Sequence, residues 1–358
     1  MLAQEVDGTT GPEGGTVLVT GGAGFFGDIL VQRLLGDGMT CVSLDVQPPV
    51  TEHPRLQSVE GDIRNRKLLE GLFAEHRFSA VFHCAAMLAH AVTDEDLLWS
   101  SNVEGTRVLA DVAAAHDVAK LVFISSNCLW ATNFHRPVTE DDEPSPVEIY
   151  GRSKWEAERI LSARRDALDT VILRTPTIVA SGRLGLLTIL FDFIREGRRV
   201  WTVGDGSNRY QFVYGPDLAD ACVRATRQPG SGLYNVGSDD VKSLREVYEY
   251  VIDRAGTNAR VVSIPKAPAL AAMRVAAALK VSPLGPYHWR MIAEDFEFDT
   301  SRVKAELGWR PSLTNEEMLA EAYKAYDADY DEIQARTRVS AHRQPAALKA
   351  IRLVKWLS

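Results

Sequence analysis

Three residues of this sequence have the types and the spacing of a proton-transfer site. Tyr150 and Lys154 stand four apart in the pentapeptide YGRSK, and Ser126 closes an apolar run 24 residues before the tyrosine. A phenol has an ordinary pKa of about 10, so it is a poor base at neutral pH unless a nearby cation favours its phenolate. Because residues four apart share a helix face, we expect the Lys154 ammonium to lie beside the Tyr150 hydroxyl and lower its pKa. Ser126 then holds the substrate hydroxyl whose proton Tyr150 removes.

A glycine-rich segment near the N-terminus predicts a dinucleotide site for that chemistry. VLVTGGAGFFG, residues 17–27, reads as a short apolar strand, a turn and a helix start, with Gly21, Gly24 and Gly27 spaced three apart. The first glycine allows a tight turn, the second lets the backbone approach a pyrophosphate, and the third lets the helix pack closely on the strand. Backbone N–H groups and the positive end of the helix then face the phosphates. Without this segment, YxxxK alone would fit an ordinary helix surface equally well.

An acidic residue at the end of the next strand selects the dinucleotide. TCVSLD ends in Asp45, which lies 18 residues after Gly27, and no Lys or Arg stands at 46–49. A carboxylate at this place accepts hydrogen bonds from both ribose hydroxyls of the adenosine half and repels a 2′-phosphate. The sequence therefore predicts NAD rather than NADP.

The elements that must position these residues follow from the hydrophobic pattern. Short apolar strands are expected near 17–20, 40–45, 80–84, 121–125 and 170–174, with segments of helical spacing between them. This alternation predicts an α/β fold with a doubly wound parallel sheet and a cofactor site at the carboxyl ends of its strands. From about residue 175, proline and glycine interrupt the pattern repeatedly. That change predicts a smaller C-terminal substrate-binding lobe.

Composition excludes several classes of function. With 46% apolar and 25% charged residues, the 358-residue chain can bury a full core. Its net charge of −8 argues against nucleic-acid binding through a positive field. The four cysteines are scattered without metal-type spacing, which predicts no metal site and favours a reducing cytoplasm. The polar N-terminus lacks the apolar stretch of a signal peptide, and no segment has the length of a spanning helix.

Taken together, the motifs resemble those of the extended short-chain dehydrogenase/reductase family, and within it the NAD-dependent sugar epimerase/dehydratase group. The resemblance covers about 17–330 and includes GDIRN, HCAA, SNVEGT, FISSN, YNVGS and ELGWRP. It implies that Ser126, Tyr150 and Lys154 are catalytic. The cofactor-binding residues that it implies are Gly21, Gly24, Phe25, Phe26, Gly27, Asp45, Asp62, Ile63, Cys84, Ala85, Ala86, Asn102, Tyr150 and Lys154.

Composition, pattern and resemblance together give the expected organisation of the chain. The domains expected are a disordered N-terminus at 1–15, a Rossmann-type NAD-binding domain at 16–175 with parts of 205–240, a substrate-binding lobe at 176–330 and a basic amphipathic tail at 331–358. A homodimer is the assembly that is common in this family. In the tail, six Lys or Arg residues and no acidic ones occur between Arg336 and Ser358. This tail either packs on the acidic body or on a partner subunit, or makes weak contact with an anionic membrane surface.

The reaction implied by the resemblance begins with hydride transfer between a substrate carbinol carbon and the nicotinamide, with Tyr150 as the acid/base. In that reading Lys154 also holds the nicotinamide ribose. Family members that dehydrate their substrate carry Asp-Glu directly after the catalytic Ser or Thr, where this chain has Asn127 and Cys128. The leading hypothesis is therefore C-4 epimerisation of a nucleoside-diphosphate sugar through a transient 4-keto intermediate.

The substrate segment departs from the family pattern. RYQFVYGPD places Tyr210 where the family has a diphosphate-binding arginine, with Arg209 one residue earlier, and Arg183 is another candidate phosphate ligand. Thr177 stands near a commonly occurring asparagine that this chain lacks. The expected substrate-binding residues are Met87, Asn127, Cys128, Thr177, Arg183, Arg209 and Tyr210.

Other functions stay open at this point. GDGSN and the following Phe212 also resemble the 3β-hydroxysteroid and sterol-carboxylate dehydrogenases, which suggests net oxidation of an apolar secondary alcohol as the alternative. Cys128 falls where a GDP-mannose 3,5-epimerase carries a proton-exchanging cysteine, but GRLGLLTILF offers no matching second lysine, which favours a small pocket-lining residue. A binding protein that has lost its chemistry is a third reading. A dehydrogenase accumulates NADH with turnover, whereas an epimerase does not.

Overall fold

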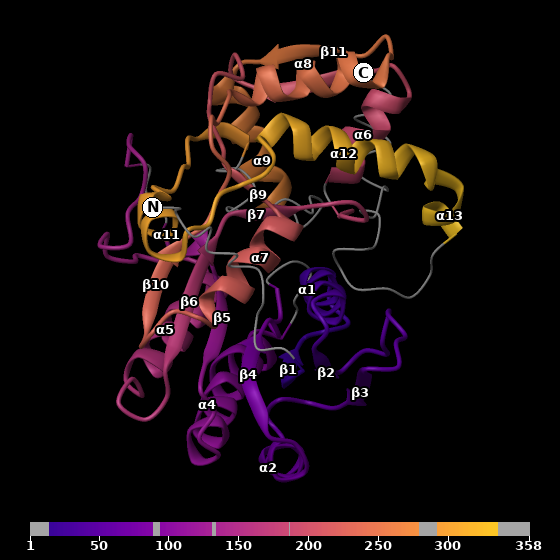
Figure 1. The fold of residues 1–358 in the computed structure, drawn as a ribbon. Helices are drawn as coiled ribbons and strands as arrows, with labels where there is room; N and C mark the ends of the chain where they lie inside the picture. The colour runs from indigo at the N-terminus through magenta and orange to yellow at the C-terminus, as the bar shows by residue number, and fades with distance from the viewer. Residues whose placement is uncertain (1–13, 89–93, 131–133, 186, 279–291, 336–358) are drawn as a thin grey trace, which may run out of the picture.

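The computed structural model describes residues 14–88, 94–130, 134–185, 187–278 and 292–335. Its centre is a seven-stranded sheet in the order β3-β2-β1-β4-β5-β6-β10, in which every neighbouring pair is parallel (Figure 1). The strands are β1 (Thr16–Thr20), β2 (Thr40–Asp45), β3 (Leu56–Glu60), β4 (Phe78–His83), β5 (Leu121–Ser126), β6 (Thr170–Thr175) and β10 (Gly232–Asn235). The strand order reverses between β1 and β4, and open sheets of this kind bind ligands at such a switch point.

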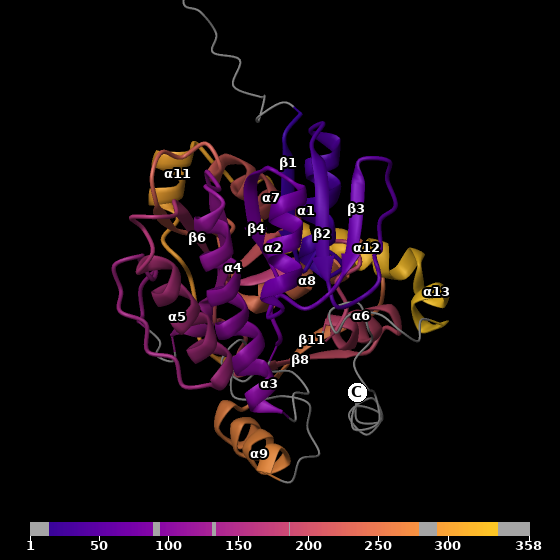
Figure 2. The same ribbon diagram turned by 90° about the horizontal axis from the view of Figure 1, so that it is seen from below.

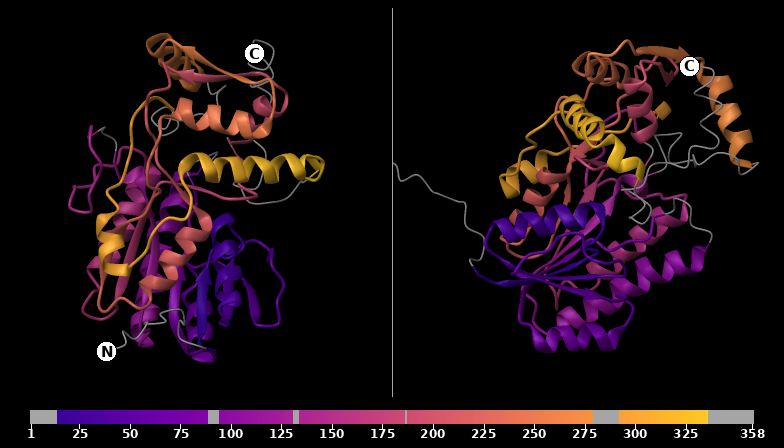
Figure 3. Two further views of the ribbon diagram at one scale, coloured as in Figure 1. Left: turned by 45° about the horizontal axis from the view of Figure 1, so that its top comes forward. Right: turned by 90° about the vertical axis from the view of Figure 1, so that its right-hand side faces the viewer.

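Helices cover both faces of this sheet, because successive strand side chains point to opposite sides. Val17 and Val19 belong to one core, whereas Leu18 belongs to another. The helices of the first core are α1 (Phe25–Gly36), α7 (Gly215–Ala225) and α11 (Ser301–Leu307). Those of the second are α2 (Arg66–Glu75), α4 (Gly105–Ala115) and α5 (Ile149–Ser162), and Figure 3 shows α1 and α2 on opposite sides of the sheet.

Two short elements beside the sheet have unusual helical geometry. The α-helix α3 (Glu95–Trp99) continues into a π-helical turn, η1 (Ser100–Glu104), and then directly into α4. A single 3₁₀ turn, η2 (Asn127–Leu129), follows β5. A π-helical turn inserts an extra residue and is frequent at functional sites.

The second lobe begins at the carboxyl end of β6. Two parallel strand pairs form it, β7 (Thr177–Val179) with β9 (Phe212–Tyr214) and β8 (Arg199–Val203) with β11 (Arg260–Ile264). Its helices are α6 (Leu187–Arg195), α8 (Leu244–Ala255), α9 (Lys266–Ala278), α12 (Asn315–Ala328) and α13 (Tyr330–Ala335). Helices α6, α8 and α12 enclose a separate core, whereas α9, at the outer side of the lobe (Figures 2 and 3), packs Ala269, Leu270 and Met273 in a smaller cluster with Val203 and Ile264.

The fold class predicted from the sequence is confirmed, and the five expected strands correspond to β1, β2, β4, β5 and β6. Most of the expected N-terminal segment and most of the expected tail lie outside the described residues, because residues 1–13 and 336–358 are not among them. Within the described part of the chain, no helix is long and apolar enough to span a membrane. The domain boundaries, the homodimer and the cytoplasmic location stay predictions.

Candidate active site

The carboxyl ends of β1, β4 and β5 bring the predicted catalytic and cofactor residues to one edge of the sheet. Ser126 is the last residue of β5, and its side chain forms a hydrogen bond with Tyr150 near the start of α5. The Ser126 Oγ also accepts a hydrogen bond of 3.2 Å from the backbone N–H of Cys128. Ser126 is therefore held from one side by the backbone and faces the phenol with its hydroxyl.

The pKa of Tyr150 moves in the direction opposite to the sequence prediction. Burial raises the pKa of this phenol well above its ordinary value, and the nearby Cys128 thiol adds to the rise. The hydrogen bond from Ser126 and the positive charge of Arg183 oppose it. The cations that face Tyr150 thus include Arg183, and the expectation that Lys154 keeps this pKa low is wrong for this structure.

Lys154 instead points its ammonium under the end of β5. Its Nζ donates a 2.8 Å hydrogen bond to the carbonyl oxygen of Ile124 and lies 4.5 Å from the centroid of the Phe123 ring. The side chain is only 3% exposed. Burial lowers the pKa of Lys154 to about 8, although the nearby Cys84 and Glu158 oppose that decrease. A buried ammonium of this kind costs stability at neutral pH, which favours a functional reason for its presence.

The low pKa of Lys154 predicts a specific pH dependence of stability. Between pH 8 and the ordinary pKa of 10.5, the unfolded chain keeps a proton that the folded chain has released. The contribution of Lys154 to the free energy of unfolding therefore rises with pH across this window, by up to about 3 kcal/mol. We expect the free energy of unfolding of the wild type, relative to that of Lys154→Met, to increase by about 3 kcal/mol between about pH 7 and 10. Urea unfolding measures this difference. A difference that stays constant with pH contradicts a buried ammonium.

The turn between β1 and α1 is shaped for a bound pyrophosphate. Gly21 has φ = 74°, and a Cβ on it would lie 2.6 Å from the backbone nitrogen of Ala85. A Cβ on Gly27 would lie 2.0 Å from the carbonyl oxygen of Gly21, so only glycine lets the helix start this close to the strand. A Cβ on Gly24 would meet only that same oxygen, at 3.1 Å, and is otherwise open. The backbone at Gly24 is therefore open to the approach of a phosphate, and the glycine turn fits the pyrophosphate of NAD.

Two glycine substitutions separate cofactor binding from folding. Gly24→Ala needs only a small local shift, so we expect a near-normal melting temperature with NAD affinity lowered at least about tenfold, since the new methyl group enters the phosphate site. Gly27→Ala overpacks the strand-helix junction and is expected to cost about 1–3 kcal/mol of stability. Thermal unfolding with and without NAD measures both quantities. Equal NAD binding by Gly24→Ala and the wild type contradicts a cofactor at this turn.

Asp45 is oriented toward the glycine turn. Its Oδ2 accepts a hydrogen bond of 3.0 Å from the backbone N–H of Ala23, and its Oδ1 accepts one of 2.9 Å from that of Gln47. Each carboxylate oxygen keeps a lone pair for another donor. This is the arrangement that two ribose hydroxyls require, and it would repel a 2′-phosphate.

The remaining predicted cofactor residues follow β3 and β4. Asp62 forms an ion pair of 2.5 Å with Arg64, while Ile63 is buried so closely against α4 that a Cβ on Gly105 would lie 2.5 Å from its Cδ1. Cys84, Ala85 and Ala86 follow the last residue of β4. Burial raises the pKa of the Cys84 thiol to about 12, so this thiol is no nucleophile at neutral pH.

Asn102, in the π-helical turn, forms two hydrogen bonds with the backbone of Met87, the residue that follows Ala86. Its Oδ1 accepts a 2.7 Å hydrogen bond from the backbone N–H of Met87, and its Nδ2 donates one of 2.9 Å to the Met87 carbonyl. Asn102 is 3% exposed. The structure therefore places its amide under the loop after β4 and uses it to shape that loop.

Two of the predicted substrate-binding residues, Asn127 and Tyr210, form a hydrogen bond with each other. The Asn127 Nδ2 donates a 2.6 Å hydrogen bond to the Tyr210 hydroxyl, and both side chains are buried, at 4% and 2% exposure. The Tyr210 ring also packs at a tilt against the rings of Phe212 and Phe296. The structure thus turns Asn127 and Tyr210 into the protein, where they join the catalytic loop to the second lobe. Their role at the substrate stays a prediction, and no pattern in the sequence signals this pairing of residues 83 apart.

The two candidate phosphate-binding arginines lie in different surroundings. Arg209 is exposed, and its backbone N–H donates to the Asp295 carboxylate at 2.8 Å. Burial raises the pKa of Glu297, and the positive charge of Arg209 opposes that rise. The guanidinium of Arg209 therefore acts on the Glu297 carboxyl group. Arg183 has its guanidinium 5.3 Å from the centroid of the Phe25 ring in the glycine turn, and its charge acts on Tyr150. Arg183 and the partly exposed Cys128 therefore belong to the group of residues that act on Tyr150. Thr177 is the first residue of β7.

A buried ion pair below the site was missed by the sequence analysis. Arg174 and Glu158 are each 2% exposed and are joined at 2.7 Å, while Ser125, the neighbour of Ser126, donates a 2.5 Å hydrogen bond to Glu158. Arg174 also lies 4.9 Å from the Trp130 ring centroid. The pair ties α5 to β5 and β6. Only the unusual charge in the apolar run VILRT could have signalled it.

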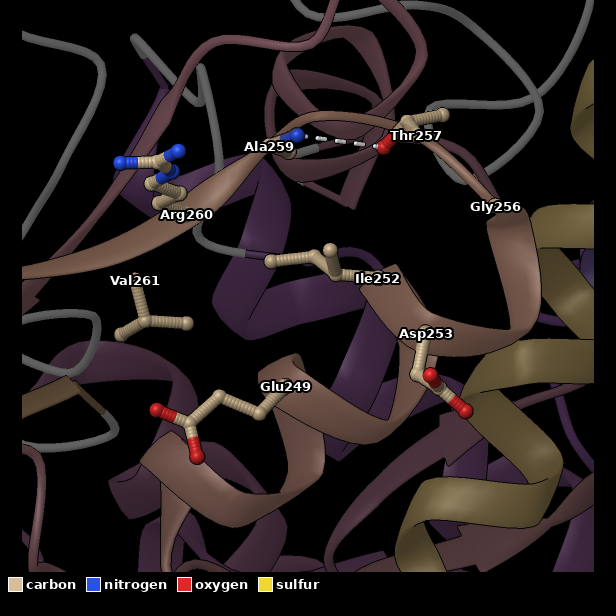
Figure 4. A pocket seen from close by; sticks show the side chains of 8 residues that line it. All are labelled: Glu249, Ile252, Asp253, Gly256, Thr257, Ala259, Arg260 and Val261. Carbon is tan, nitrogen blue, oxygen red and sulfur yellow. Dashed lines mark hydrogen bonds between the residues drawn. The ribbon is translucent and has the colours of Figure 1, made fainter.

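A surface pocket elsewhere does not share these residues. It has a volume of about 570 Å³ and lies between α8 and β11 of the second lobe, where Ile252, Asp253 and Arg260 line it with Glu249 and Val261 among others (Figure 4). The side chains in Figure 4 include two carboxyl groups, those of Glu249 and Asp253, and none of the predicted site residues. In the described ranges, no group of three or more metal-ligating side chains is present either.

Comparison with known proteins decides the family of this site. Residues 17–237, which contain the glycine turn, Ser126, Tyr150 and Lys154, match the family described as the NAD dependent epimerase/dehydratase family. The chain belongs to this family. It is accordingly an enzyme that uses NAD, as the sequence predicted.

Individual proteins also resemble this chain over most of its length. An uncharacterised protein of Sinorhizobium fredii, y4nG, is 37% identical over 95% of this chain and 86% of its own length. A UDP-glucose 4-epimerase of Mycolicibacterium smegmatis is 29% identical over 86% of this chain and 97% of its own. The structure of MoeE5 with UDP-glucose and NAD matches with a TM-score of 0.71 and 25% identity, covering 88% of this chain and all of that one. The family enzyme described here thus shares both its sequence pattern and its fold with nucleotide-sugar enzymes.

Proposed function

We propose that this enzyme is an NAD-dependent 4-epimerase of a nucleoside-diphosphate sugar. The observation that carries the proposal is that Ser126, at the end of β5, and Tyr150, near the start of α5, act on each other near the sheet edge that carries the glycine turn, without a carboxyl group at the two positions after the serine. The similarity to the UDP-glucose 4-epimerase of M. smegmatis supports the choice of substrate class.

The residues that hold NAD in this proposal are those of the glycine turn, Asp45, and the strand end after β4. Bound there, NAD supplies an acceptor and donor of hydride for the carbon that is epimerised. Lys154 holds the ribose of the nicotinamide half, for which its ammonium has further N–H donors besides the one bonded to the Ile124 carbonyl. Asp45 takes the two hydroxyls of the adenosine ribose.

The proton is moved by the chain's own groups. Ser126 orients the substrate hydroxyl, and Tyr150 removes its proton when the sugar is oxidised and returns a proton when the inverted hydroxyl forms. Because burial keeps the proton on Tyr150, loss of that proton depends on the groups that oppose the pKa rise, namely Ser126 and Arg183. No proton is consumed over the complete cycle, as epimerisation requires.

Dehydration is disfavoured by the same geometry. Elimination of water needs a separate acid and base, which dehydrating members carry directly after the catalytic hydroxyl residue. Here the first of those positions is the buried amide of Asn127, which donates to Tyr210, and the second is the thiol of Cys128. Neither position offers a carboxyl group to the substrate.

The proposal is tested by supplying NAD and nucleotide sugars to the purified protein. We expect interconversion of a UDP- or dTDP-linked hexose or hexuronate with its 4-epimer, without a net rise in NADH absorbance. Net NADH formation with an apolar secondary alcohol would instead favour the dehydrogenase alternative. Failure to interconvert any such sugar pair overturns the epimerase proposal.

A further inference from the structure

A chain of buried hydrogen bonds runs beneath the site and includes a histidine that the proposed reaction does not use. His83, the last residue of β4, is 0% exposed. Its Nδ1 lies 2.8 Å from the hydroxyl of Thr20, which precedes the glycine turn, and its Nε2 lies 2.9 Å from the hydroxyl of Thr106 in α4. The imidazole therefore joins the cofactor turn to the helix that follows the π-helical segment.

The hydrogen-bond directions select one tautomer of His83. The Thr106 hydroxyl donates its single proton to the backbone carbonyl of Asn102 at 2.6 Å, so toward His83 it can only accept. Nε2 must then carry the proton, and Nδ1 must accept from the Thr20 hydroxyl. Burial lowers the pKa of His83 to about 3, and the charge of Lys154 adds to that decrease. The ring therefore stays neutral across the pH range in which enzymes are assayed.

The far end of this chain reaches the catalytic helix. The Asn102 Nδ2 donates a 3.0 Å hydrogen bond to the Ser153 hydroxyl, which donates in turn at 2.7 Å to the backbone carbonyl of Tyr150. Asn102 lies in the π-helical turn, with its backbone carbonyl bonded to Thr106 and its amide bonded to Ser153 of α5. Thr20, His83, Thr106, Asn102 and Ser153 thus form one continuous series, called the buried relay below.

We propose that His83 is a positioning residue that, through the buried relay, sets the placement of the NAD-binding turn relative to Tyr150 and Lys154. This inference rests on the proposed function, because positioning matters only if Tyr150 acts beside the cofactor. Hydrogen bonds at both ring nitrogens fix the orientation of His83 between β1 and α4. Here each ring nitrogen has one partner of defined donor or acceptor role, and the partners come from different elements.

The tautomer is tested first, because it requires no substrate. In protein labelled with ¹⁵N-histidine, the His83 signals, assigned by their loss in His83→Leu, are expected to show a proton on Nε2 and no titration between about pH 5 and 8. A proton on Nδ1, or titration near pH 6.5, overturns the relay. This result does not depend on which sugar the enzyme accepts, so it separates failure of the relay from failure of the proposed function.

The positioning role is tested by matched variants. His83→Leu and Thr106→Val both interrupt the buried relay, whereas Thr106→Ser keeps the hydroxyl. Phe82→Leu makes a cavity in the same strand but on the opposite core, and serves as the control for stability alone. The readouts are NAD affinity, kcat and KM for the nucleotide sugar.

We expect His83→Leu and Thr106→Val to weaken NAD binding and to lower kcat at least about tenfold at unchanged KM, since small misplacements of reacting groups cost this much or more. Thr106→Ser should restore both values, and Phe82→Leu should lower the melting temperature without changing either. If His83→Leu matches Phe82→Leu in kcat and in NAD affinity, His83 is only a core residue. NAD affinity decides the question even if no sugar is turned over.

Discussion

Replacing Tyr150 by Phe is expected to lower kcat by about 10²–10⁴-fold, the range that general acid/base groups contribute. The substitution removes only the hydroxyl that bonds to Ser126 and leaves the ring in its place. NAD affinity and thermal stability should therefore stay close to those of the wild type. Steady-state kinetics with the epimer pair, together with NAD titration, measure the effect.

Another tyrosine supplies the control for this substitution. Tyr326 is also buried, at 2% exposure, and its hydroxyl bonds to Asp192 in the core of the second lobe. Tyr326→Phe should lower stability slightly and leave kcat unchanged. If Tyr150→Phe retains more than about a tenth of the wild-type kcat, Tyr150 is not the acid/base.

The largest effect on stability is expected at the ion pair of Glu158 and Arg174. Glu158→Gln keeps the shape of the side chain but leaves the guanidinium of Arg174 buried without its counter-charge, which costs about 3–5 kcal/mol. Since folded domains are stable by only about 5–15 kcal/mol, this variant should be marginal. Urea unfolding measures the loss. Because α5 carries Tyr150 and Lys154, activity should fall well before global unfolding.

Two further variants make that result decisive. The double variant Glu158→Leu with Arg174→Met removes both charges and should recover most of the lost stability, since buried pairs are often replaceable by apolar residues. Asp327→Asn breaks the exposed ion pair with Arg195 and should cost no more than about 1 kcal/mol. Equal costs for Glu158→Gln and Asp327→Asn would show that the buried pair is not a structural anchor.

The parts of the fold that the sequence predicts are those with a local signal. β1, β2, β4, β5 and β6 are apolar runs, and the glycine turn has a spacing that few other structures require. β3 was missed because it is an edge strand with exposed side chains, and β10 because it has only four residues and begins with glycine. Local periodicity is weak in both.

The sequence names candidate residues for the site but does not give their contacts. Spacing on α5 places Tyr150 and Lys154 on one face, yet it cannot show that the Ile124 carbonyl holds the ammonium or that Arg183 acts on the phenol. Asn127 and Tyr210 are 83 residues apart, and His83 lies 63 residues from Thr20. Such pairings arise from the tertiary fold, for which one sequence contains no pattern.

The most direct test of the account follows a hydrogen label at the reacting carbon. With NAD-loaded enzyme and a nucleotide sugar deuterated at C-4, we expect the 4-epimer to keep its deuterium and NADH absorbance not to rise, because the same hydride is removed and returned beside Tyr150. Loss of deuterium to solvent, or its accumulation in NADH, would contradict epimerisation by the arrangement of Ser126, Tyr150 and the glycine turn.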